Sequence, residues 1–248
     1  MSLLTPMLRT SPLTDWFSDV QRVQGMLDFE AALVRAEVEC GLVPQTALNP
    51  IIESCRHEKI DFSALGQAAA SAGNLAIPLV KQLTARVKER NEAAARYVHW
   101  GATSQDAIDT GFILQLRGAL AETESLLQRL LDALARQAER HQDTVMPGRT
   151  WMQHALPVTF GLKLAGTLDA LLRWQVRLRE MRARVLALQF GGAAGTLDSL
   201  KTQAPPIAVA LAKALDLQLP DAPWHSQRDR LLEVQPFGAG IGHLELSL

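Results

Sequence analysis

Residues 99–106 read HWGATSQD, and they stand directly before the first of two long helical patterns in this chain. From Ser104 onward, apolar side chains recur every three or four positions, which keeps one face of an α-helix apolar. The positions that form this pattern are Ile108, Phe112, Leu116, Leu120, Leu127, Leu131, Leu134 and Ala138. The stretch therefore predicts a helix that begins at Ser104 and is long enough to take part in a bundle.

A second polar stretch, RTWMQHALP at residues 149–157, precedes the second long pattern. The apolar positions of that pattern are Leu164, Leu168, Leu171, Trp174, Leu178, Met181, Val185 and Leu188. Because proline is tolerated in the first turn of a helix, Pro157 is expected there, with Gln153 and His154 at the helix mouth. Two patterns of this length and regularity favour a bundle that other subunits complete.

Shorter helical segments precede and follow the two long patterns. Start and stop signals predict helices at residues 19–40, after Pro50, from Asp61, at 75–90 and near 207–215, with a further helix entry at 224–230. No alternation of apolar and polar residues predicts a strand. The chain is therefore expected to be all-α. Its expected parts are an N-terminal helical domain at 1–103, a partial central helical bundle at 104–234 and an atypical tail at 235–248.

Composition and charge exclude several classes of protein. Apolar residues make up 48% of the chain, the net charge is −1, and no apolar run is long enough to span a membrane. We therefore expect a soluble protein without a membrane or nucleic-acid partner. Cys40 and Cys55 lack metal-ligand spacing, so free thiols and a cytoplasmic location are expected. The arginines at 173–184 flank an apolar seam, which favours a solvated face or salt bridges between helices.

The two expected helix mouths offer polar groups that suit a carboxylate ligand. Backbone N–H groups are free at a helix N-terminus, and the helix dipole favours negative charge there. Thr103 and Ser104 could bind such a ligand, or one of them could cap the helix while Asp106 complements its dipole, and both can hold together. His99 suits a structural hydrogen bond as well as a ligand contact, whereas His154 could move a proton near neutral pH.

Six blocks of the chain, in this order, resemble the fumarase/aspartase superfamily, and within it the 3-carboxy-cis,cis-muconate cycloisomerase branch. They are residues 26–33, 72–80, 99–106, 149–163, 190–197 and 224–230, and the resemblance extends over residues 14–234. Adenylosuccinate lyases look similar at 99–106 and at His154, but commonly carry a histidine-rich segment where this chain has residues 72–74. Trp151 stands where many members have a histidine, so the resemblance places more of the proton transfer on His154.

The resemblance implies an enzyme without metal or cofactor that lactonises 3-carboxy-cis,cis-muconate to 4-carboxymuconolactone in aromatic degradation. His154 is then the catalytic residue. The implied substrate-binding residues are His99, Thr103, Ser104, Gln105, Gln153, Gln227 and Arg228. A homotetramer is implied, in which loops from three subunits form each site. Two alternatives stay open: a lyase that releases fumarate from adenylosuccinate or argininosuccinate, and a non-catalytic helical assembly module.

The chain departs from the family in two respects. The serine-bearing loop of the superfamily, Gly-Ser-Ser-x-Met-Pro-x-Lys-x-Asn-Pro, is missing, and residues 235–248 resemble no part of the family. We therefore expect a truncated or frame-shifted gene product with an incomplete bundle and weak or absent turnover. Apolar faces that further helices would cover are expected to promote oligomerisation or aggregation.

Overall fold

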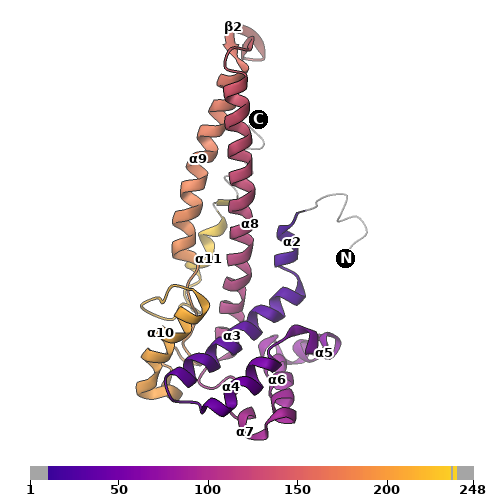
Figure 1. The fold of residues 1–248 in the computed structure, drawn as a ribbon, viewed down its shortest axis with the longest axis vertical. Helices are drawn as coiled ribbons and strands as arrows, with labels where there is room; N and C mark the ends of the chain where they lie inside the picture. Colours follow the sequence, from indigo (N-terminus) through magenta and orange to yellow (C-terminus); the bar gives the residue numbers. More distant parts are fainter. Residues whose placement is uncertain (1–10, 236, 239–248) are drawn as a thin grey trace. The chain divides into compact units, whose positions relative to one another are not determined.

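The computed structural model describes residues 11–235, 237 and 238, which form two compact units (Figure 1). The first unit contains the described residues up to Ala119 together with Arg184–Arg230, and the second contains Leu120–Ala183 with the described residues after Arg230. Most of the regular structure is helical, as the sequence predicts. No helix in the described ranges is long and apolar enough to cross a membrane.

Helix α3 (Asp19–Glu39) contributes much of the core of the first unit. At its start the Ser18 hydroxyl oxygen accepts a hydrogen bond from the Gln21 N–H, and at its end Gly41 adopts φ 74°. The helix predicted at residues 19–40 is therefore confirmed. Its buried apolar side chains include Met26, Leu27, Phe29 and Leu33.

Short helices complete the N-terminal part of this unit. They are α2 (Leu13–Trp16), α4 (Gln45–Ser54), η1 (His57–Lys59), α5 (Phe62–Ala72), α6 (Ala76–Arg90) and α7 (Glu92–Ala95). The predicted start at Asp61 is confirmed, because its carboxylate accepts the Ala64 N–H at 2.9 Å. The helix predicted after Pro50 is present but begins earlier than expected, because α4 starts at Gln45 and contains this proline. A proline removes one N–H donor, and burial of Ile51 beside it favours continuation of the helix.

Helix α8 (Ser104–Arg140) begins where the sequence predicts. Within the first unit it crosses α3 at a pair of glycines. A Cβ atom on Gly25 would lie 2.6 Å from the carbonyl oxygen of Gly111, and one on Gly111 would lie 2.8 Å from the backbone nitrogen of Met26. The two backbones therefore touch, which only glycine allows.

This close crossing changes which face of α8 is buried. Asp106, Asp109 and Thr110 are buried beside the crossing, although they are polar. Phe112, which the apolar pattern places on the buried face, is 36% exposed, while its neighbour Ile113 is fully buried. The pattern is wrong at this position because protein surrounds the first turns of α8 on several sides, so apolar periodicity no longer reports the buried face.

Residues 184–230 complete the first unit. A glycine-rich loop at 190–195 leads to η2 (Asp198–Gln203) and α10 (Ala204–Leu215), and the segment ends in the first residues of α11 (Asp229–Leu232). Helix α10 packs against α3, and Ala187 forms an isolated parallel bridge with Gln218. The helix predicted near 207–215 and the helix entry predicted at 224–230 are confirmed.

A β-hairpin in the second unit follows α8, where the sequence predicts no strand. Strands β1 (Val145–Thr150) and β2 (Gln153–Thr159) are antiparallel and joined by Trp151 and Met152, which adopt φ 48° and 60°. Positive φ at both central residues is typical of the tight turns whose twist suits a hairpin. The expectation that the chain contains no strand is therefore wrong for residues 145–150 and 153–159.

The second long helix, α9 (Phe160–Val185), begins later than expected. Pro157 lies in strand β2 opposite Pro147 rather than in the first turn of the helix. The helix starts instead where the Thr159 hydroxyl oxygen accepts a hydrogen bond from the Leu162 N–H at 3.1 Å.

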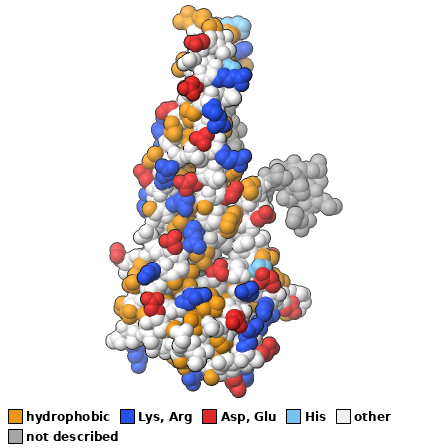
Figure 2. Space-filling view, viewed as in Figure 1, with side chains coloured by type: hydrophobic (Ala, Val, Ile, Leu, Met, Phe, Trp, Pro, Cys, Tyr) orange, Lys and Arg blue, Asp and Glu red, His pale blue; other side chains and the backbone are white. Residues whose placement is uncertain are grey.

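Apolar residues from both long patterns that the sequence predicts are buried in the second unit. Its buried apolar side chains include Leu127, Leu131, Leu171, Leu178 and Met181. Arg179 and Arg182 both pair with Glu124, and Arg173 pairs with Asp169. The Arg179 and Arg182 pairs join α9 to α8 and confirm the salt bridges predicted between helices, whereas the Arg173 pair lies within α9. Basic and acidic side chains are interspersed over the face shown in Figure 2. The tail predicted at 235–248 lies, except for residues 235, 237 and 238, outside the described residues.

Candidate functional site

Two residues with left-handed backbone shape the turn that precedes α8. His99 has φ 59° and Gly101 has φ 73°. A Cβ atom on Gly101 would lie 2.5 Å from the Leu200 side chain, so a larger residue would strain both backbone and packing. The turn brings Thr103 and Ser104 to the mouth of α8, where their hydroxyl groups form no hydrogen bond with any described residue.

The buried carboxylate of Asp106 gathers the site around this mouth. It accepts hydrogen bonds from the Thr103 N–H at 3.0 Å, the Gln189 side-chain amide at 3.0 Å, and the N–H groups of Gly191 and Gly192 at 3.0 and 2.9 Å. Burial raises the pKa of Asp106, although these N–H donors oppose the shift. Asp106 therefore caps the turn and also binds a loop from a distant part of the chain.

That glycine-rich loop lies directly against the turn. Gly192 adopts φ 66°, and a Cβ atom on it would lie 3.3 Å from the carbonyl oxygen of Gly101. Gly195 adopts φ 81°, and a Cβ atom there would lie 3.9 Å from the Cε1 atom of His225. The glycines allow the loop to fit between the turn and the segment at 224–228.

His99 forms a short ion pair inside this unit. Its Nδ1 lies 2.6 Å from Oε1 of Glu30, whose side chain is buried, and the imidazole is 16% exposed. Burial alone would lower the pKa of His99, but the negative charge of Glu30 and its hydrogen bond outweigh burial and raise it. His99 therefore makes the structural hydrogen bond that the sequence analysis considered, and its raised pKa favours the protonated imidazole.

Gln189 connects the third segment, residues 224–228, to the same cluster. Its side-chain oxygen accepts the Trp224 N–H at 2.6 Å, and its side-chain nitrogen lies 3.5 Å from Nδ1 of His225. The indole N–H of Trp224 donates to the Leu188 carbonyl at 3.0 Å. Three segments that are far apart in sequence therefore meet at Asp106 and Gln189.

The guanidinium of Arg228 is engaged by a carboxylate of the protein. Its two terminal nitrogens donate to the buried Asp109 at 2.6 and 2.9 Å, and this bidentate pairing raises the pKa of Arg228. Gln227 is exposed one position earlier. The predicted contact of Arg228 with substrate stays a prediction, and two of its donors already have a partner.

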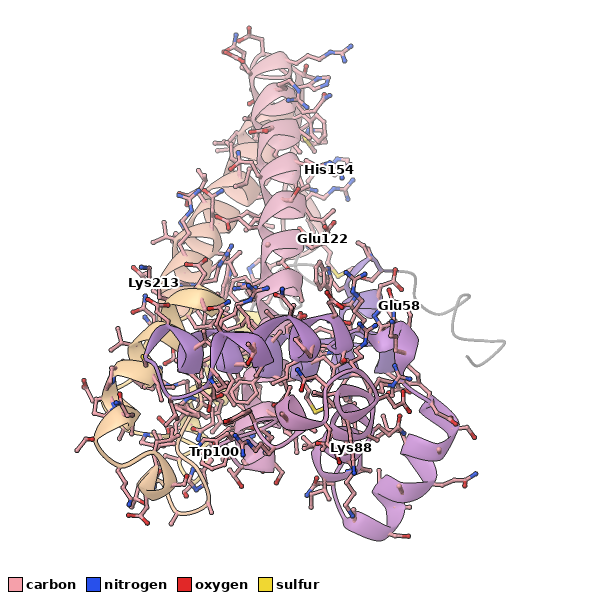
Figure 3. All side chains as sticks on the ribbon, turned by 60° about the horizontal axis from the view of Figure 1, so that its bottom comes forward. Glu58, Lys88, Trp100, Glu122, His154 and Lys213 are labelled. Atoms are coloured by element: carbon pink, nitrogen blue, oxygen red, sulfur yellow. The ribbon has the colours of Figure 1, made fainter. Side chains whose placement is uncertain are left out.

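The structure places the predicted site residues in two groups. His99, Thr103, Ser104, Gln105, Gln227 and Arg228 belong to the first unit. Gln153 and His154 belong to the second, on strand β2, where both are exposed. Figure 3 labels Trp100 of the turn and His154 of the hairpin. Because α9 begins only at Phe160, the expectation that His154 lies at a helix N-terminus is wrong.

The sequence-based site lacks Glu30, Asp109, Gln189 and His225, and it gives Asp106 only a role at the helix dipole. A signal exists for Asp109, because it follows Asp106 by three positions and the two therefore share one face of a helix. Gln189 stands between two apolar residues in sequence, and no local pattern indicates its role.

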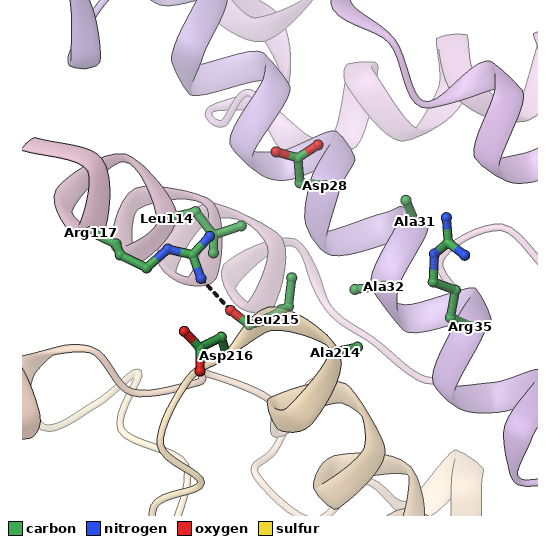
Figure 4. Close-up of a pocket in the computed structure, with 9 residues that line it drawn as sticks. All are labelled: Asp28, Ala31, Ala32, Arg35, Leu114, Arg117, Ala214, Leu215 and Asp216. Carbon is green, nitrogen blue, oxygen red and sulfur yellow. Dashed lines mark hydrogen bonds between the residues drawn. The ribbon is translucent and has the colours of Figure 1, made fainter. Parts of the chain in front are cut away.

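A cleft lies on α3, α8 and α10 of the first unit (Figure 4). This cleft has a volume of about 520 Å³, and its charged lining residues are Asp28, Arg35, Arg117 and Asp216. Arg117 donates a hydrogen bond to the Leu215 carbonyl. The cleft contains none of the predicted site residues and its charges balance, so the Asp106 cluster remains the candidate site. Within the described ranges, no cluster of three or more His, Cys, Asp or Glu residues could hold a metal ion.

Comparison with known proteins places this geometry in a family. A family model described as lyase matches residues 8–241. The chain is 60% identical over 223 residues to the 3-carboxy-cis,cis-muconate cycloisomerase of Pseudomonas aeruginosa, covering 90% of this chain and 49% of that protein. It is 54% identical over 225 residues to the enzyme of that name from Pseudomonas putida, covering 90% and 53%. The chain therefore spans about half the length of these relatives.

Solved structures give the same similarity as the sequence comparisons. The 3-carboxy-cis,cis-muconate lactonizing enzyme from Pseudomonas putida matches with a TM-score of 0.91 and 53% identity, over 95% of this chain and 53% of that one. The turn, the glycine-rich loop and the 224–228 segment thus meet around Asp106 in a chain that belongs to the lyase family and is similar to the 3-carboxy-cis,cis-muconate cycloisomerases.

Proposed function

We propose that this chain binds 3-carboxy-cis,cis-muconate and carries part of a site that lactonises it to 4-carboxymuconolactone. The relatives with this activity in their names support the proposal. The observation that carries it is the N-terminus of α8, where the hydroxyl groups of Thr103 and Ser104 form no hydrogen bond with any described residue. A helix N-terminus suits a ligand that carries carboxylates.

The proposed reaction balances as an isomerisation with uptake of one proton. An oxygen of one carboxylate forms a C–O bond to an alkene carbon of the same molecule, and the alkene electron pair shifts onto the carbon next to another carboxylate. A proton added at that carbon completes the lactone. The chain's task is to hold the two reacting groups together and to stabilise the aci-carboxylate that forms between these steps.

His154 is the proposed general acid, and Gln153 beside it is a proposed donor to a substrate carboxylate. His99, Thr103, Ser104, Gln105, Gln227 and Arg228 are the proposed binding residues. Both groups act within a homotetramer in this proposal. Large exposed apolar side chains of the second unit support an oligomer: Trp151, Met152 and Leu156 are 95, 96 and 82% exposed. A cytoplasmic location is proposed with this metabolic role.

The test is a substrate panel on the full chain. The expected result is binding of 3-carboxy-cis,cis-muconate and at most a slow loss of its ultraviolet absorbance, because the serine-bearing loop is missing, with no fumarate released from adenylosuccinate or argininosuccinate. His154→Gln should lower that rate by at least about a hundredfold, as expected when a general acid is removed. The control is His57→Gln, which alters an imidazole bonded to Gln24.

Other outcomes lead to the alternatives. Fumarate release without any change in 3-carboxy-cis,cis-muconate would favour a lyase of the same superfamily. Stable oligomers in light scattering, with no binding of any tricarboxylate in calorimetry, would favour a non-catalytic assembly module.

A further inference from the structure

We propose that His225 donates its Nε2–H to a substrate carboxylate and that Gln189 is the positioning residue that selects this tautomer. The inference rests on the proposed function, because the ligand is taken to be a polycarboxylate. It adds a binding residue that the motifs at 99–106 and 149–157 do not contain.

The orientation of the Gln189 side chain follows from its two partners. Its oxygen accepts the Trp224 N–H at 2.6 Å, and its nitrogen donates to the Asp106 carboxylate at 3.0 Å. The flipped amide would place N–H against N–H and oxygen against carboxylate. Since Gln189 is fully buried, water cannot relieve that conflict, and only one orientation is possible.

This orientation determines which nitrogen of His225 carries the proton. The Gln189 side-chain nitrogen has two hydrogens, one on Asp106 and one directed to Nδ1 of His225 at 3.5 Å. A ring nitrogen that faces an N–H donor has to accept, so the neutral ring holds its proton on Nε2. A carboxylate ligand requires such a donor.

The location of His225 fits a ligand contact. The residue is half-buried, and its ring edge lies beside Gly195 of the glycine-rich loop. Through Gln189 it is anchored to the same Asp106 carboxylate that holds the Thr103 turn. Two of the five N–H donors of Arg228 in this segment are engaged by Asp109, and His225 supplies a further donor in the same segment.

The first measurement is nitrogen-15 NMR of the histidine rings in the full chain. The spectrum is recorded above the ordinary histidine pKa of ~6.5, so that neutral rings dominate. His225→Gln assigns the resonances by difference. We expect an unprotonated Nδ1 and a protonated Nε2 for His225, and a mixture of tautomers in Gln189→Leu. A protonated Nδ1 in the wild-type chain would overturn the proposal even if the Gln189 variant failed to fold.

The second measurement is calorimetric binding of tricarballylate, a tricarboxylate without a double bond that cannot be lactonised. His225→Ala should weaken binding by about tenfold, as for loss of one hydrogen bond to a charged group. His225→Gln should retain most of the affinity, because its amide can place an N–H near the Nε2 position. The matched control is His141→Gln, which changes an imidazole bonded to Thr144 and should leave affinity unchanged.

The two proposals fail in different ways. Equal affinities for wild type and His225→Ala, together with turnover of 3-carboxy-cis,cis-muconate, would overturn the role of His225 and leave the proposed function standing. The second case is that His225 shows the expected tautomer, and His225→Ala the expected loss of tricarballylate affinity, in a chain that neither binds nor converts 3-carboxy-cis,cis-muconate. That result would overturn the proposed function alone.

Discussion

Glu37 of α3 carries a buried carboxyl group that the candidate site does not use. Its side chain is fully buried, and neither carboxyl oxygen has a hydrogen-bond partner among the described residues. Burial, followed by repulsion from Glu30, raises the pKa of Glu37 to about 9. The group is therefore protonated in the folded chain at neutral pH, whereas the unfolded chain would release that proton.

This difference predicts a pH-dependent stability. An acid whose pKa is raised on folding stabilises the fold fully below its ordinary value of 4.5, and that contribution is lost as the pH rises toward about 9. Glu37→Gln removes the titration. Relative to wild type, its free energy of unfolding should improve by up to about 1.4 kcal/mol per pH unit between these limits. Urea unfolding at several pH values measures this, with the exposed Glu39→Gln as control, and parallel curves for Glu37→Gln and wild type would contradict it.

A second prediction concerns the charge on His99. Glu30→Gln keeps an acceptor near Nδ1 but removes the negative charge, so burial dominates and the pKa of His99 should fall below its wild-type value. An NMR titration of the His99 ring measures the change. Glu58→Gln, on an exposed residue near His57, should leave the His99 titration where it is. An unchanged His99 pKa in Glu30→Gln would show that the ion pair does not set it.

A third prediction concerns Asp106, whose carboxylate links separate segments of the site. In Asp106→Asn an amide N–H₂ replaces one of two oxygens, each of which accepts backbone or side-chain N–H groups. Donors then face a donor, and the variant should lose about 2–3 kcal/mol of unfolding free energy. Asp143→Asn, at an exposed position, should change it by less than about 0.5 kcal/mol. Chemical denaturation compares wild type with the two variants, and equal denaturation midpoints for all three would contradict this role of Asp106.

At the scale of elements, the crossing of α3 and α8 depends on two glycines. A methyl group on Gly25 or Gly111 would press on backbone atoms at 2.6 and 2.8 Å, which cannot move aside as a flexible side chain can. Gly25→Ala and Gly111→Ala should each destabilise the first unit by about 1–3 kcal/mol. The matched control is Gly66→Ala in α5, where a Cβ atom meets open space, and there alanine should stabilise by about 0.5–1 kcal/mol. Thermal unfolding of the variants checks the sign, and stabilisation of all three would refute the contact.

At the scale of the whole molecule, α9 exposes apolar side chains that suit another subunit. Leu172 and Val176 are 45 and 53% exposed and lie four positions apart, hence on one helix face. Val176→Glu should shift the chain toward smaller species in light scattering, because a buried charge opposes association. Lys163→Glu reverses a charge at another exposed position of α9 and should leave the mass unchanged. A mass unaffected by Val176→Glu would exclude this face as a contact.

Much of the helical framework could be predicted because its signals are local. Asp61 caps a helix by a bond to a residue three positions ahead, and the leucines at 127, 131, 171 and 178 are spaced to face one side of a helix. The hairpin could not be predicted in this way. Most residues of β1 and β2 are exposed, whichever face of the hairpin they occupy. Alternation of apolar and polar residues indicates a strand only where one face is buried.

The sequence by itself determined the long helix that starts at Ser104, the family and most of the residues at the α8 mouth, because helix signals and motifs lie within short stretches. Only the tertiary structure decided how that mouth is built. Asp106 meets Gln189, Gly191 and Gly192 across 83 to 86 positions of chain, and Arg228 meets Asp109 across 119. Contacts at such separations leave no periodic trace in the sequence. The raised pKa of Glu37 likewise exists only once folding has removed its carboxyl group from water.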